Sequence, residues 1–90
     1  MGKKIAVLVR DRQAEAMRMA VGLTLADDEP TVFVMDKKLE MDESVELNVE
    51  TLGDLDVKIY TNTSENNNFE LKSTEEIAKD LVNYDNILPY

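Results

Sequence analysis

Runs of apolar residues along the chain predict four β-strands. The run "KIAVLV" at residues 4–9 is rich in β-branched residues and apolar at consecutive positions, which is typical of a parallel strand covered on both faces. The runs "PTVFVMD" at residues 30–36 and "DVKIYT" at residues 56–61 predict a second and a third strand. "NILPY" at residues 86–90 predicts a short fourth strand, in which Pro89 limits backbone pairing and indicates an edge or terminal position.

The segments between these runs carry helical patterns. Residues 11–28 are rich in Ala, Met and Leu, which favour helix, and Asp11 is a candidate N-cap. Residues 41–55 fit both a helical and an alternating pattern, but their length, their acidic start and a glycine near the end favour helix. Residues 73–84 open with a capping box, in which Ser73 is followed three positions later by Glu76, and predict a third helix.

This alternation of strands and helices predicts an α/β fold. The expected order is β-α-β-α-β-α-β in one domain of residues 1–90. Right-handed crossovers between parallel strands place helices on both faces of a sheet, so we expect a three-layer α/β/α architecture with a four-stranded parallel sheet. The pattern leaves the order of the strands within the sheet open.

The composition restricts the chemistry that the chain can perform. It contains no cysteine and no histidine, which excludes thiolate chemistry and removes the commonest general base and transition-metal ligand. We therefore expect no catalytic residue, no cofactor and no metal site. The net charge of −9 repels phosphate backbones, so we expect no nucleic-acid partner. The apolar run "IAVLV" is too short for a secretory signal or a membrane span, and we expect a cytoplasmic protein that makes no contact with membranes.

Polar residues at the start of the first helix are candidates for a ligand site. Ligands of open parallel sheets bind outside the carboxyl ends of the strands, and Arg10, Arg12 and Gln13 follow the first strand directly. Unpaired N–H groups and the dipole at a helix start favour an anion there. The alternative interpretation, which the missing glycine-rich turn favours, is that the arginines pair with surface carboxylates such as Asp11 and Glu15.

The loop "YTNTSENNNF" at residues 60–69 follows the third strand and is the second candidate. Its amides donate and accept hydrogen bonds without charge, and Asn62 is the candidate ligand-binding residue. Asparagines also suit turns, which is the alternative interpretation. A hydroxyl nucleophile in this loop would need a base, and the sequence supplies no histidine for that role.

The chain as a whole resembles the DsrE/DsrF-like family of small α/β proteins. The resemblance rests on "KIAVLVRD" leading into "AEAMRMAVGLTLADD", followed by "TVFVMDKKLEM", by "VKIYTN", and by a short helix with a terminal strand. It implies a sulfur-relay protein or an uncharacterised relative, often a homo-oligomer, and the relay members carry persulfide on a loop cysteine. Since this sequence has no cysteine, the resemblance assigns it no catalytic residue, and we expect no persulfide transfer.

The first helix is also the candidate interface. Its apolar residues cover more than the stripe of roughly 100° that a sheet buries, and exposed apolar patches often mark interfaces. We expect contacts through Met19 or Leu23, whichever lies on the outer face, in a homo-oligomer or with a protein partner. The expected function is therefore a non-catalytic interaction or self-associating domain. The alternative is a small-ligand or anion-binding module at the carboxyl edge of the sheet.

Overall fold

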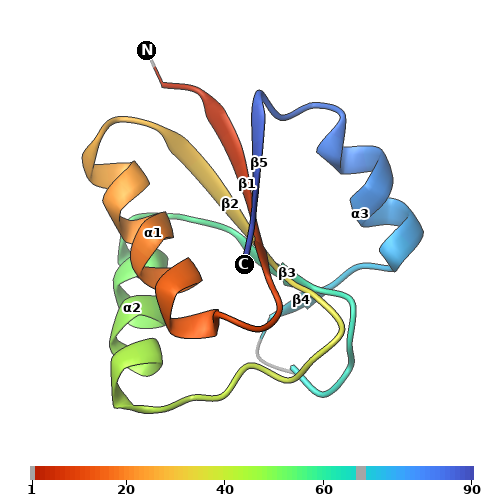
Figure 1. Cartoon of the computed structure of the whole chain (residues 1–90), viewed down its shortest axis with the longest axis horizontal. Helices are drawn as coiled ribbons and strands as arrows, with labels where there is room; N and C mark the ends of the chain where they lie inside the picture. The colour runs from red at the N-terminus through yellow and green to blue at the C-terminus, as the bar shows by residue number, and fades with distance from the viewer. Residues whose placement is uncertain (1, 67–68) are drawn as a thin grey trace.

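The computed structural model describes residues 2–66 and 69–90, which form one sheet and three helices (Figure 1). The elements in chain order are β1 (Lys4–Val9), α1 (Gln13–Leu25), β2 (Glu29–Val34), α2 (Glu43–Asp54), β3 (Ile59–Thr61), β4 (Glu70–Leu71), α3 (Thr74–Leu81) and β5 (Asn86–Pro89). None of the helices in these two described ranges is long and apolar enough to cross a membrane.

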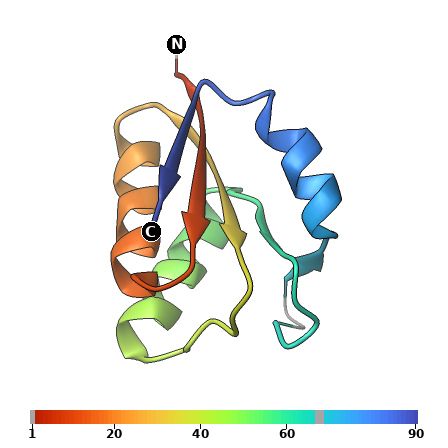
Figure 2. The ribbon, with the colours of Figure 1, turned by 45° about the vertical axis from the view of Figure 1, so that its right-hand side comes forward.

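The five strands are all parallel and lie in the order β4-β3-β2-β1-β5. Figures 1 and 2 show α1 and α2 side by side on one face of the sheet and α3 on the other. The handedness rule accounts for this division. The chain moves outward from β1 through β2 and β3 to β4, and then returns through α3 past β1 to β5. Right-handed crossovers in opposite directions place their helices on opposite faces.

The core consists of two layers because successive strand residues point to opposite faces. In β1, Ile5, Val7 and Val9 pack under α1 and α2, whereas Ala6 and Leu8 pack under α3. The α3 layer is the smaller of the two. Its centre is the fully buried Phe33, whose ring stacks against the Tyr60 ring at 5.6 Å and meets the Tyr84 ring edge-on at 5.9 Å.

The predicted helix at residues 41–55 and the predicted capping box are confirmed. Asp42 is the N-cap of α2, and its side chain accepts a hydrogen bond from the Val45 N–H at 2.8 Å. Ser73 Oγ accepts from the Glu76 N–H, and the Glu76 carboxylate accepts in turn from the Ser73 N–H, both at 3.1 Å. The strand β5 pairs with β1 alone, so the edge position that Pro89 indicated is confirmed.

The prediction of four strands in a β-α-β-α-β-α-β order was wrong, because β4 adds a fifth strand between β3 and α3. Its two residues, Glu70 and Leu71, are both exposed and belong to no apolar run. The backbone creates this strand: Tyr60 lies beside Glu70 in the register, and the Lys72 N–H donates to the Thr61 carbonyl at 2.8 Å. Such pairing depends on the path of the preceding loop, which side-chain periodicity does not encode.

Two local predictions also need correction. Asp11 does not cap α1, since the N-cap position is Arg12, without a side-chain hydrogen bond, and the Asp11 carboxylate forms an ion pair with Lys37 instead. The third strand begins at Ile59 rather than at residue 56. Asp56 adopts the left-handed conformation, with φ 61°, and the Val57 N–H donates to the Leu52 carbonyl at 2.9 Å. Residues 56 and 57 therefore complete the end of α2.

Candidate functional site

At the carboxyl edge of the sheet, Arg10 and Asn62 meet at Asp36. The Arg10 Nε lies 3.1 Å from the Asp36 carboxylate. The Asn62 side chain accepts from the Asp36 N–H at 2.7 Å and donates to the Asp36 carboxylate and to the Thr74 hydroxyl, both at 2.9 Å. These contacts join the ends of β1, β2 and β3 to the start of α3.

Asp36 occupies the left-handed region, with φ 67°, which is uncommon for a residue other than glycine. The hydrogen bond from Asn62 lowers the pKa of the Asp36 carboxyl group below its ordinary value, and the hydrogen bond from Arg10 lowers it further. Both hydrogen bonds favour the charged form. The Asp36 carboxylate thus connects Arg10 and Asn62 to the turn that follows β2.

A second asparagine of the predicted loop, Asn66, is buried and makes three hydrogen bonds. Its side-chain oxygen accepts from the Leu39 N–H at 2.7 Å, and its amide donates to the Lys37 carbonyl and to the Thr61 hydroxyl, both at 3.0 Å. The Thr61 hydroxyl itself donates to the Val34 carbonyl at 2.9 Å. Asn62 and Asn66 therefore act as structural clamps, because their hydrogen bonds hold the loop after β3 against the loop after β2. Asn67 and Asn68 of the same predicted loop lie outside the described residues.

The start of α1 is tied to the loop between β2 and α2. The Gln13 amide donates to the Lys38 carbonyl at 3.1 Å and accepts from the Glu40 N–H at 3.0 Å. The Lys37 ammonium forms a hydrogen-bonded ion pair with Asp11, which lowers the pKa of the Asp11 carboxyl and raises the pKa of the Lys37 ammonium. Sequence reasoning found Gln13 but missed these partners, which lie more than twenty positions away in the chain.

Arg12 lies apart from the other candidate residues. Its guanidinium stands 5.0 Å from the centre of the Tyr90 ring and 3.6 Å from the Glu15 carboxylate. The backbone N–H groups of Asp11 and Arg12 both donate to the Tyr90 backbone oxygen, at 3.1 Å and 2.8 Å. A residue of this chain thus occupies the crevice between β1 and β5, where the strand order reverses and where open α/β sheets bind ligands.

The carboxyl edge therefore holds the four predicted ligand residues, and each of them already contacts other protein groups. Gln13 and Asn62 are held by hydrogen bonds, whereas Arg10 and Arg12 form ion pairs with Asp36 and Glu15. Within residues 2–66 and 69–90, no buried side-chain nitrogen or oxygen lacks a hydrogen-bond partner. The same ranges contain no group of three carboxylates that could hold a metal ion.

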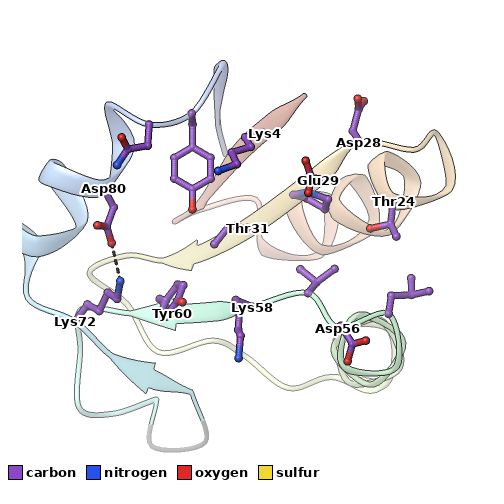
Figure 3. Close-up of a pocket in the computed structure, with 15 residues that line it drawn as sticks. Lys4, Thr24, Asp28, Glu29, Thr31, Asp56, Lys58, Tyr60, Lys72 and Asp80 are labelled. Carbon is purple, nitrogen blue, oxygen red and sulfur yellow. Dashed lines mark hydrogen bonds and ion pairs between the residues drawn. The ribbon is translucent and has the colours of Figure 1, made fainter. Parts of the chain in front are cut away.

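A hollow of about 600 Å³ lies on the face of the sheet that α3 covers, and it continues around the amino ends of β2 and β3 (Figure 3). Sequence reasoning did not find it. It arises because one helix cannot cover five strands, which leaves Thr31 and Tyr60 only partly buried. Lys72 bridges one side, with its ammonium 2.7 Å from the Asp80 carboxylate and 4.3 Å from the centre of the Tyr60 ring. The hydrogen bond to Asp80 raises the pKa of Lys72.

The charges around this hollow are mixed. Figure 3 shows Lys72 and Asp80 facing each other on one side, while Asp28 and Glu29 lie on the opposite side. The lining as a whole contains three lysines and four carboxylates: Lys4, Lys58, Lys72, Asp28, Glu29, Asp56 and Asp80. A ligand of one charge sign would therefore meet attraction and repulsion together.

The two predicted interface residues lie in different environments on α1. Met19 is 40 % exposed, whereas Leu23 is only partly exposed and packs against the core layer under α1 and α2. Leu25, at the end of the same helix, is 77 % exposed. Beside Met19 lies a shallow hollow of about 440 Å³ between α1 and the end of β5. Of the two predicted interface residues, Met19 is therefore the one that lies exposed on the outer face of α1.

Comparison of the chain with protein-family models, with curated proteins and with solved structures gives no match.

Proposed function

We propose that this chain is a cytoplasmic, non-catalytic interaction domain of the DsrE/DsrF-like type, which associates with itself or with another protein and carries no persulfide sulfur. The observation that supports it most is the outer face of α1, where Met19 is exposed beside a shallow hollow and Leu25 is exposed at the end of the helix. The carboxyl edge of the sheet supports the non-catalytic part of the proposal, because its polar side chains form hydrogen bonds and ion pairs with other groups of the protein.

The association is tested by light scattering coupled to size exclusion. We expect a mass above 10.2 kDa at high protein concentration, and Met19→Glu is expected to reduce it to the monomer mass, because a carboxylate would have to lose its water in the contact. Val82→Glu is the matched control, since Val82 is 83 % exposed on the opposite side of the sheet. If the native chain stays monomeric and binds no other protein through Met19, the proposed function is wrong.

The absence of persulfide transfer has a separate test. The thiolate is the group that carries such sulfur, and the sequence contains no cysteine. After incubation with a persulfide donor, intact-mass measurement should show no gain of sulfur. A stable gain that can be passed to an acceptor thiol would contradict this part of the proposal.

Anion binding at Arg10, Arg12, Gln13 and Asn62 is the alternative, and it has less support. Arg10 is paired with Asp36, and both Gln13 and Asn62 make their hydrogen bonds within the protein. On titration with inorganic phosphate, we expect small amide NMR shifts spread over the basic residues. A saturable shift confined to residues 10–13 would favour the alternative instead.

A further inference from the structure

The hollow on the outer face of α1 has an apolar centre between two opposite charges. It is lined by Met19, Gly22 and Tyr90, with Glu15 and Arg18 beside them on the same helix. Glu15 and Arg18 are the only charged residues of α1, so the helix has no net charge. The face therefore offers an apolar contact together with a donor and an acceptor of charge-assisted hydrogen bonds.

Gly22 at the centre of this face has no role that the single chain explains. It is exposed, its φ is not positive, and a Cβ atom built on it would have no neighbour within 4 Å. Glycine is the least favourable residue in a helix after proline. Where the backbone conformation does not require a glycine, the usual advantage of glycine is that another group can approach the backbone closely.

We infer that the occupant of this face is a second copy of the chain, with α1 packed antiparallel against α1 about a two-fold axis and Met19 of each copy against Gly22 of the other. This inference rests on the proposed function and specifies its partner. In such a pair, the residues at equal distances on either side of the axis face each other. An axis midway between positions 19 and 22 places the flexible Met19 side chain over the missing Cβ, and methionine fills irregular gaps well.

Charge favours this face over the exposed apolar side chain of α2. The chain carries −9, so two copies repel each other unless they meet at a neutral surface. Leu47 on α2 is 63 % exposed, but α2 contains four acidic residues and no basic one, which gives it a charge of −4: Glu43, Glu46, Glu50 and Asp54. A two-fold contact brings a surface against itself, and the neutral α1 face, with both signs present, satisfies that requirement.

Disulfide trapping tests the contact directly, because the chain has no cysteine of its own. Met19→Cys and Gly22→Cys proteins are mixed in equal amounts and oxidised, and intact mass distinguishes mixed from homogeneous dimers. A disulfide needs Cα atoms within about 7 Å, so the mixed dimer should predominate. Val82→Cys, on the opposite side of the sheet, should trap little dimer. Random pairing already makes about half of the dimers mixed, so a mixed fraction of no more than about half, or a high yield from the Val82→Cys control, would overturn the inference.

A pair of glycine variants gives a second, independent test. Gly53 in α2 is equally open, with nothing within 4 Å of a built Cβ, so Gly22→Ala and Gly53→Ala should both raise the melting temperature of the dilute monomer by about 3–8 °C. Only Gly22→Ala should weaken the dimer, by about tenfold or more in dissociation constant. An unchanged dissociation constant for Gly22→Ala would contradict the close α1 contact.

The two proposals fail in different ways. A chain that stays monomeric up to about 1 mM and forms no mixed disulfide overturns the second-copy inference. The interaction function then survives only if Met19→Glu abolishes binding to a different, purified protein. An oligomer whose mass is unaffected by Met19→Glu overturns the second-copy inference at α1, whereas the self-association of the proposed function then takes place through another surface.

Discussion

Replacing Asn66 with alanine should remove the clamp that holds the loop between β2 and α2. The substitution eliminates three hydrogen bonds, to the Leu39 N–H, the Lys37 carbonyl and the Thr61 hydroxyl. Leu39 is only 2 % exposed, so its N–H group would be left without a partner in a buried place. Such a group loses its water without compensation.

The magnitude follows from the hydrogen bonds. The stranded Leu39 donor costs about 1–3 kcal/mol, and the two other lost hydrogen bonds contribute about 0.5–1.5 kcal/mol each, so we expect Asn66→Ala to lower the free energy of unfolding by about 2–6 kcal/mol. A domain of this length has a total of about 5–13 kcal/mol. The melting temperature should fall by at least about 8 °C, since 1 kcal/mol corresponds to about 4–8 °C at this size.

Thermal and urea unfolding, followed by circular dichroism at neutral pH, measure this loss. Asn83→Ala is the control, because the exposed Asn83 makes no side-chain hydrogen bond to the described residues. Asn66→Asp keeps the acceptor for the Leu39 N–H but loses both donors, and should be nearly as harmful as alanine. If Asn66→Ala costs less than about 1 kcal/mol, no more than an ordinary surface change, the clamp does not stabilise the fold.

Three further substitutions test the remaining local contacts. Ser73→Ala removes the capping box and should cost about 1 kcal/mol, with faster amide exchange first at the start of α3; unchanged exchange there would contradict the role of the cap. The pKa of Asp36 is lowered, so its stabilising effect is complete above its unfolded-state value near pH 4 and is lost as the pH falls below it. Asp36→Asn should therefore reduce the difference in urea stability between about pH 7 and pH 3, and an unchanged difference would mean that the carboxylate contributes nothing. The pKa of Lys72 is raised by Asp80, so its contribution is present at neutral pH and is lost above about pH 10.5. Lys72→Met should flatten the loss of stability in that alkaline range, and an equally steep loss would refute the assignment to this pair.

The residues of the carboxyl edge show how far sequence reasoning reached at the candidate site. Position in the chain was enough to predict that Arg10, Gln13 and Asn62 lie at one edge of the sheet, because the carboxyl ends of parallel strands share an edge. Their partners were not predictable. Asp36 and the backbone of the loop after β2 lie about 25 positions away from Arg10 and Gln13. A hydrogen bond over that distance depends on how two loops fold against each other.

The same division applies to the interface face of α1. The sequence showed an excess of apolar residues on this helix, since no single stripe could hold them all. It could not decide between Met19 and Leu23, which are four positions apart and lie on neighbouring parts of the helix surface. The position of α1 on the sheet, beside α2, directs Leu23 toward the core and Met19 toward the solvent.

The sequence by itself determined the elements whose signals are local: the strand at residues 4–9, the three helices with the capping box at Ser73, and the parallel α/β class. These depend on apolar periodicity and on contacts three or four positions apart, which are written in consecutive residues. Only the tertiary structure decided the strand β4, the clamping role of Asn66 and the single-helix cover that leaves a hollow beside Tyr60. Each of these depends on backbone groups that meet across the fold, and backbone groups are the same at nearly every position of the chain.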